Sequence, residues 1–230
     1  MAKFCIHCGK KLNDGEVCDC QASAPRVSNN LGTSLSETLK GMFVKPIDTL
    51  KTYTNESNFN LALILSGVFC LVISLFMLSF VKNATDTAAS SMGALTLYAI
   101  SSSAIQIPYL KIFFVVLIVG VASVFIYTGL LYLVNSVMFK GERNFKKVFT
   151  MYGINTIITT AALLVSAIFM FINVALGFGI YLLGAVLNMV YMYKGIECLG
   201  VKDENKHGYI YLITTVFYII VLVIISLIFS

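Results

Sequence analysis

The chain has 230 residues, of which 58% are hydrophobic and only 12% are charged, and its mean hydropathy is +0.88. Soluble domains carry about 25% charged residues. A soluble globular domain is therefore excluded, because a fold of this size has too little interior to hide so much apolar surface. The formal net charge of +5 comes from 16 Lys and Arg residues that are placed unevenly along the chain.

Four cysteines lie within the first 20 residues, in the patterns Cys5-x-x-Cys8 and Cys18-x-Cys20. In a reducing compartment, clustered thiols are typical of metal binding rather than of disulfides. Four thiolates supply the tetrahedral ligand set that Zn²⁺ takes in structural sites. We predict that Cys5, Cys8, Cys18 and Cys20 bind one Zn²⁺, and we do not expect His7 to be a ligand. The alternative is a tail whose thiols are incidental.

Residues 4–20 also resemble the short zinc ribbons at the N-termini of many bacterial membrane proteins. The resemblance is carried by Phe4–Leu12, with its Cys-x-x-Cys-Gly, and by Gly15–Cys20. The second cysteine pair departs from the usual pattern, because only one residue separates its members. The resemblance implies that residues 1–20 are a zinc ribbon with a structural zinc, since four protein thiolates leave no open position for water.

Residues 21–33 are typical of a flexible linker, and residues 34–57 of an amphipathic juxtamembrane segment. Ser34 and Glu37 fit a capping box that would start a helix. Apolar residues then recur at helical spacing: Leu31, Leu35, Leu39, Met42 and Phe43. This pattern indicates a helix that either lies on the inner leaflet or packs beneath the membrane domain. Pro46 is expected to end that helix or to start the next one.

Residues 58–230 contain four uncharged tracts, namely 57–81, 112–139, 148–193 and 208–230. About 18 or more apolar residues with few charges are typical of a transmembrane helix. The third tract would make a helix of roughly 70 Å, about twice a bilayer core, so we expect it to turn near Asn173. The sequence therefore predicts an all-α polytopic membrane protein with five transmembrane helices, over about 60–81, 110–139, 148–172, 174–193 and 209–229.

The basic residues predict the orientation of these five spans. The head holds seven Lys and Arg residues, the loop 140–147 holds four and the loop 194–207 holds three, whereas the other side holds only Lys82 and Lys111. An excess of Lys and Arg marks the cytosolic side. We therefore expect a multi-pass protein of the cell membrane with a cytosolic N-terminus and with Ser230 outside.

Three asparagines, Asn135, Asn155 and Asn188, lie on the second, third and fourth spans at a similar expected depth. They could form a polar layer that holds the helices together, or they could line a ligand site. No charged residue or histidine lies deep in any span, which argues against a proton-coupled pump. The sequence also lacks H-E-x-x-H, G-x-S-x-G and P-loop motifs, so we predict no catalytic residues and no enzyme.

The membrane part resembles the Yip domain, a family of Rab/Ypt-interacting, five-span membrane proteins with bacterial relatives. The resemblance covers about residues 38–230 and is carried by the five spans, Met42–Ile47, Phe139–Phe149 and Tyr191–Ile196. The resemblance implies vesicle trafficking and membrane shaping for the eukaryotic relatives, with small GTPases as their partners. The zinc ribbon suggests a bacterial relative, for which the resemblance implies no firm activity. The acidic-Leu-x-Gly-Pro-Ile segment of those members is reduced here to Lys45-Pro46-Ile47.

The leading functional hypothesis is a membrane-organising or scaffolding protein whose cytosolic zinc-ribbon head recruits a protein partner. The alternative is a small permease or channel component, suggested by the asparagine-bearing spans. The lipid bilayer is the first expected partner, and a second copy of the chain, forming a homo-oligomer, is another candidate partner. Nucleic acid is not expected, because the basic residues of the head are offset by Asp14, Glu16 and Asp19.

Overall fold

The computed structural model describes residues 3–4, 11–12, 31–91, 108–201 and 203–229. The chain divides into two compact units, Met1–Ser36 and Glu37–Ser230. In the first unit, β1 (Lys3–Phe4) and β2 (Lys11–Leu12) form a two-stranded antiparallel pair. The predicted zinc ligands and most of the expected linker lie outside the described residues.

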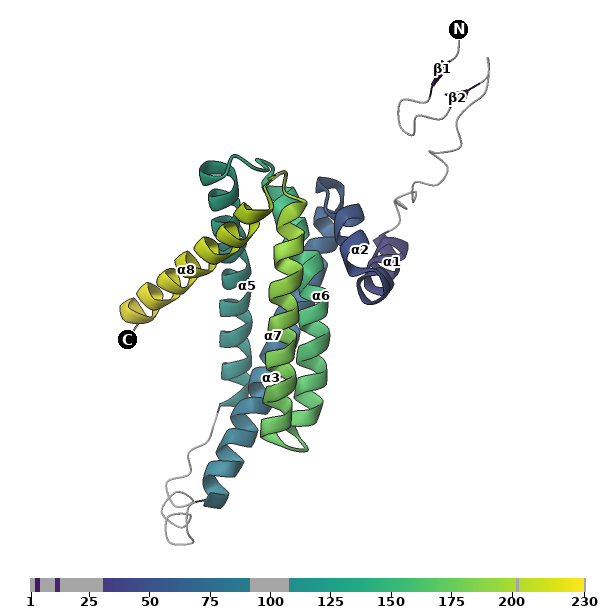
Figure 1. Ribbon diagram of the computed structural model, residues 1–230. Coiled ribbons are helices and arrows are strands. Elements are labelled where there is room, and N and C mark those ends of the chain that lie inside the picture. The colour runs from purple at the N-terminus through teal and green to yellow at the C-terminus, as the bar shows by residue number, and fades with distance from the viewer. Residues whose placement is uncertain (1–2, 5–10, 13–30, 92–107, 202, 230) are drawn as a thin grey trace. The chain divides into compact units, whose positions relative to one another are not determined.

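The second unit is helical, and its helices are labelled in Figure 1. Two short N-terminal helices and five long ones are described: α1 (Leu31–Val44, which begins in the first unit), α2 (Pro46–Tyr53), α3 (Phe59–Ser91), α5 (Tyr109–Leu133), α6 (Phe145–Met170), α7 (Val174–Glu197) and α8 (Glu204–Phe229). A 3₁₀ turn, η2 (Glu56–Asn58), precedes α3, and a π turn, η3 (Val134–Met138), continues α5. The five long helices are long and apolar enough to cross a membrane. The expectation of an all-α protein with five spans is confirmed.

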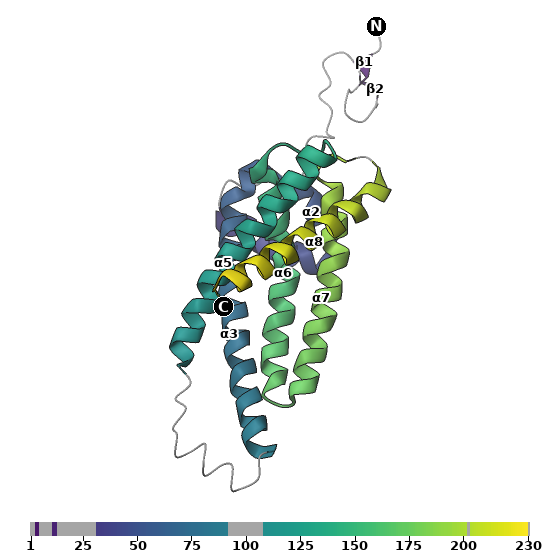
Figure 2. The same ribbon diagram turned by 90° about the vertical axis from the view of Figure 1, so that its left-hand side faces the viewer.

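Helices α3, α6 and α7 run side by side with α6 in the middle, as Figures 1 and 2 show. Helix α6 packs against α3 on one side and α7 on the other, and α5 packs against α3. Helix α8 contacts both α5 and α7 and crosses the other helices at a slant, and Tyr218 in its middle still lies against Tyr127 of α5. Large apolar side chains cover the outward faces of α5, α7 and α8. Such faces suit lipid, where apolar exposure has no cost.

Small residues bring α6 close to both neighbours. A Cβ atom added at Gly153 would lie 2.6 Å from the Cβ of Ala62 on α3 and 2.8 Å from its carbonyl oxygen. At Gly184 of α7, an added Cβ would overlap the Cβ of Ala162 on α6. Helices in a membrane associate mainly through packing, so such close approach is a main source of their stability.

The turn between α6 and α7 lies at residues 171–173, where the sequence predicted a hairpin. The side-chain oxygen of Asn173 accepts hydrogen bonds from the backbone N–H groups of Ala175 (2.8 Å) and Leu176 (3.2 Å). Asn173 therefore caps α7 and satisfies two donors that have no partner within the helix. Just before the turn, the Ser166 hydroxyl donates to the Gly177 carbonyl (2.5 Å) and ties the two helices together.

The predicted capping box at Ser34 and Glu37 is wrong, because α1 is already helical at Leu31. Glu37 instead accepts a hydrogen bond from the Tyr53 hydroxyl (2.9 Å), which joins α1 to α2. Burial, followed by this hydrogen bond, raises the pKa of Tyr53. The Glu37 carboxylate, which the local sequence pattern predicted would cap the start of the helix, therefore forms a tertiary contact instead.

Helix α1 shows features of both alternatives that the sequence left open. Thr38 and Met42 are buried on one face, whereas Leu39 and Phe43 are exposed on the other. One face therefore packs within the protein, and the other is free to meet lipid. Pro46 occupies the first turn of α2, so it starts the second helix, which was one of its two expected roles.

Candidate functional site

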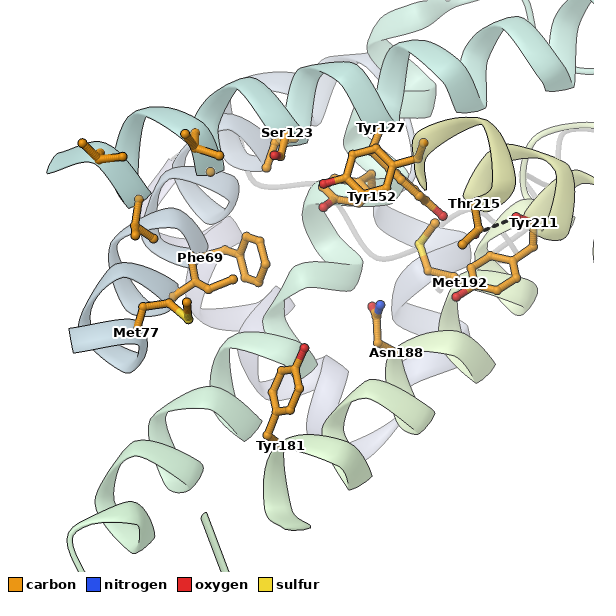
Figure 3. A pocket seen from close by; sticks show the side chains of 17 residues that line it. Phe69, Met77, Ser123, Tyr127, Tyr152, Tyr181, Asn188, Met192, Tyr211 and Thr215 are labelled. Atoms are coloured by element: carbon orange, nitrogen blue, oxygen red, sulfur yellow. Dashed lines mark hydrogen bonds between the residues drawn. The ribbon is translucent and has the colours of Figure 1, made fainter. Parts of the chain in front are cut away.

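A hollow of about 630 Å³ lies within the bundle, lined by residues of all five long helices (Figure 3). We call it the tyrosine cavity and define it by five tyrosines and one asparagine of its lining, which are Tyr127, Tyr152, Tyr181, Tyr211, Tyr218 and Asn188; Ser123 and Thr215 also line it. Its volume falls within the range of about 300–1,000 Å³ that is usual for small-molecule sites. None of its lining residues is charged.

The two ends of the tyrosine cavity differ in character. We call the end of the bundle that carries the α5–α6 and α7–α8 loops the loop end. Tyr152, Asn188 and Tyr211 lie toward it, with Tyr152 and Tyr211 each seven residues, or about 10 Å, from the start of its helix. Phe69, Ile73, Met77, Val115 and Val119 line the opposite part. The cavity is therefore mainly polar toward the loop end and mainly apolar toward the α6–α7 turn, where Tyr181 contributes one hydroxyl seven residues from the start of α7.

Aromatic contacts hold the polar part of the cavity in shape. The ring of Tyr127 lies 5.4 Å from the rings of both Tyr152 and Tyr218, and the second pair is edge-on. Such ring pairs contribute about 0.5–1.5 kcal/mol beyond the area they bury. On α8, the Thr215 hydroxyl donates to the Tyr211 carbonyl (2.8 Å), the bond dashed in Figure 3.

Several polar groups in the cavity have no hydrogen-bond partner. Asn188 accepts a hydrogen bond through its Oδ1 from Nδ2 of Asn155 (2.6 Å). Among the described residues, the Nδ2 of Asn188 has no partner, and neither do the hydroxyls of Tyr152, Tyr181, Tyr211 and Tyr218. Figure 3 shows the Asn188 amide and the Tyr181 hydroxyl directed into the hollow. Hydroxyl and amide groups that face a hollow can form hydrogen bonds with a molecule held in it.

Of the three asparagines that the sequence grouped, the structure brings two together. Asn155 of α6 and Asn188 of α7 are hydrogen-bonded, and Asn155 is almost fully buried. Asn135 lies in the π turn after α5, where its Nδ2 donates to the Glu142 carbonyl (3.3 Å) and its own carbonyl accepts from Gly141 N–H (2.9 Å). Asn135 therefore anchors the α5–α6 loop, whereas the other two asparagines join helices beside the tyrosine cavity.

The loop end is fixed by a network centred on Glu142. Its carboxylate pairs with Lys147 (2.7 Å) and accepts hydrogen bonds from the backbone N–H groups of Arg143 and Asn144. The hydrogen bond from Lys147 is the main reason that the pKa of Glu142 is lowered. The backbone N–H of Glu142 donates to the Leu199 carbonyl (2.7 Å), so the loops before α6 and after α7 are joined.

The same end of the bundle receives α2. This short helix packs against α6 and α7, with Leu50 buried and Lys51 paired to Glu197 (3.4 Å). The side chains of Glu56 and Asn144 are also hydrogen-bonded, which ties the start of α3 to the start of α6. The segment that follows the N-terminal head is thus attached to the loop end by buried apolar contacts and by polar pairs.

The predicted metal ligands Cys5, Cys8, Cys18 and Cys20 lie outside the described residues. Within the part of the chain that is described, no group of three or more His, Cys, Asp or Glu residues could hold a metal ion. What is described nearby is the strand pair, in which Lys3 is opposite Leu12 and Phe4 is opposite Lys11. Phe4 and Lys11 flank segment 5–10, which itself lies outside the described residues.

Sequence reasoning missed the tyrosines that define the cavity. Tyr127, Tyr152 and Tyr218 each lie well inside an apolar helix rather than at its end. Tyrosine is enriched at membrane interfaces, where its hydroxyl meets water. Tyrosines deep in several spans of one chain are therefore a usable signal for an internal polar site, although no sequence spacing connects residues on different helices.

Comparison with known proteins gives one match. The model of the Yip1 domain matches residues 40–227, which is most of the chain. The matched range agrees with the resemblance found in the sequence over about residues 38–230. No curated protein and no solved structure matches the chain.

Proposed function

The chain belongs to the Yip1 domain family of multi-pass membrane proteins, and we propose that it is a membrane scaffold whose N-terminal head recruits a protein partner. The family is not enzymatic, so the activity to be explained is binding or membrane organisation rather than catalysis. Binding of a partner requires a presented module and a fixed point of attachment. The attachment of α2 to the loop end is the observation that supports this proposal.

A scaffold can hold a partner at the membrane only if the segment that connects its head to the membrane domain is itself fixed to that domain. Leu50 is 1% exposed and Thr49 is 6% exposed, although both belong to a helix of only eight residues. An isolated helix this short is not stable in water, so its packing against α6 and α7 maintains it. The chain that leaves α2 toward the N-terminus is thereby fixed to the membrane domain at one end, while the head itself is available to a partner.

We further propose that Cys5, Cys8, Cys18 and Cys20 bind a structural Zn²⁺ that folds this head. The donor set fits the ion, because four thiolates complete its tetrahedral shell. A head of about 20 residues is too small to fold around an apolar core alone. The paired strands β1 and β2 on either side of segment 5–10 support the same arrangement.

Deleting residues 1–30 is expected to remove the protein's soluble crosslinked partners while leaving its membrane insertion intact. The reason is that the first helix, α1, begins at Leu31, after this segment, and that the match to the Yip1 domain begins at residue 40. The measurement is in-cell crosslinking of the full-length and truncated chains, followed by identification of the captured proteins. An unchanged set of partners would place recruitment elsewhere in the chain and overturn the proposal.

We also propose that the loop end faces the cytosol, which is supported by the bias of Lys and Arg toward the head and the two loops at that end. A cysteine replacing Ala89, which follows the candidate span Glu56–Thr85, should then react with an impermeant thiol reagent applied to intact cells. A cysteine replacing the exposed Arg143 should react only after the cells are opened. The wild-type chain controls for its own thiols, and the reverse labelling pattern would invert the orientation.

A further inference from the structure

We propose that the tyrosine cavity binds an uncharged glycerolipid of the diacylglycerol class, with its glycerol end among the tyrosines and its acyl chains toward the apolar part. This proposal concerns a ligand of the membrane domain and does not depend on the N-terminal head. Three properties of the cavity carry it: its unpaired donors, its lack of charge and its graded polarity.

The unpaired groups at the polar end can all donate a hydrogen bond. The Asn188 amide offers an N–H, and the phenols of Tyr152, Tyr211 and Tyr218 each offer an O–H. A matching molecule must present several acceptors close together. A diacylglycerol has two ester carbonyls, which accept only, and one hydroxyl, which both accepts and donates. A single-hydroxyl lipid could satisfy only one or two of these donors and would leave the others unpaired inside the membrane.

The absence of charge in the lining selects against phospholipids. Moving an ionised group into a low-dielectric site without a partner costs several kcal/mol or more. Among the described residues, none of those that line the cavity could neutralise a phosphate. The lysines nearest along α6, Lys146 and Lys147, lie at the start of the helix, five or more residues before Tyr152. A neutral headgroup therefore fits, and an anionic one does not.

The apolar part favours a lipid over water or a small polar solute. Phe69, Ile73 and Met77 of α3 and Val115 and Val119 of α5 line it. Water filling this part would find no hydrogen-bond partners, since an internal water needs about two to four of them. Acyl chains instead bury apolar surface there. In this proposal the long acyl chains leave the cavity between the helices and continue into the bilayer.

Adjacent residues on α5 provide a matched pair of variants. Ser123 lines the cavity, whereas its neighbour Ala122 is exposed on the outer face of the helix. Ser123→Phe should fill part of the cavity, and Ala122→Phe adds the same side chain toward lipid. A second variant, Tyr152→Phe with Tyr211→Phe, removes two hydroxyl donors of the lining without adding volume, and it leaves the Asn155–Asn188 hydrogen bond in place. It keeps the proposal testable if Ser123→Phe fails to fold.

The experiment is photolabelling of the purified full-length protein in vesicles that contain a diacylglycerol with a diazirine in one acyl chain. We expect labelled peptides from α3, α5 and α7, competition by unlabelled dioctanoylglycerol, and a loss of label of about fivefold or more in Ser123→Phe and in the double variant, but not in Ala122→Phe. The comparison probe is phosphatidylglycerol with the same diazirine chain. Equal labelling by the two lipids, labelling that survives both cavity variants, or no labelling by diacylglycerol would each overturn the proposal.

Discussion

Replacing Gly153 by alanine is expected to destabilise the membrane domain by about 1–3 kcal/mol, the usual cost of adding a methyl group to a well-packed interior. An added Cβ would lie 2.6 Å from the Cβ of Ala62, 2.8 Å from its carbonyl oxygen and 2.9 Å from its Cα. Two of these three atoms belong to the backbone of α3, so no side-chain rotation relieves the overlap. The two helices must move apart along their contact instead.

The matched control is Gly179→Ala in α7, where an added Cβ has no atom within 4 Å among the described residues. Alanine favours a helix over glycine by about 0.5–1 kcal/mol, so this change should be neutral or slightly stabilising. The measurement is the thermal midpoint of the purified protein in detergent, together with its elution profile. Equal midpoints for the two variants would show that the α3–α6 contact relaxes without cost.

The existence of the five spans was predictable because it depends on local composition. An uncharged apolar tract has no stable place other than the membrane, and the turn near Asn173 follows from the length limit of a bilayer. The ends of the spans were less predictable. Helix α3 continues ten residues past Val81, to Ser91, and α7 continues past Tyr193 to Glu197. Outside the apolar core of the bilayer, a helix ends where its backbone N–H and C=O groups find other hydrogen-bond partners. Hydropathy carries no information about that position.

The depth of a side chain was predictable, but the direction in which it points was not. Asn135, Asn155 and Asn188 were grouped by depth alone. The π turn at Val134–Met138 changes the helical phase at Asn135 and directs its amide to the loop, while the other two face each other. Which residues share a cavity depends on how five helices pack, and none of the long-range contacts that decide this is encoded in a local pattern.

Replacing Cys5 and Cys8 together by serine is expected to reduce copurified zinc from about one ion per chain to nearly none. Serine is a poor zinc ligand, and two remaining thiolates cannot hold a tetrahedral ion on their own. Apparent binding energies of structural Zn²⁺ in small peptides are about 10–16 kcal/mol at pH 7, so the loss should be complete rather than graded. The measurement is elemental analysis of the purified full-length chain. If the wild-type chain binds no zinc after metal-free purification and addition of Zn²⁺, the predicted site is contradicted.

Cys198→Ser is the matched control for that loss, since it removes a single thiol, at the end of α7, that is not one of the predicted zinc ligands. Burial raises the pKa of the Cys198 thiol, which disfavours the thiolate that a metal requires. Its replacement should therefore leave the zinc content unchanged. The Cys5 and Cys8 double variant should keep the thermal midpoint of the membrane domain, because Met1–Ser36 and Glu37–Ser230 are separate compact units. A large fall in that midpoint would mean that the head stabilises the bundle directly, and zinc would then control the membrane domain as well as the head.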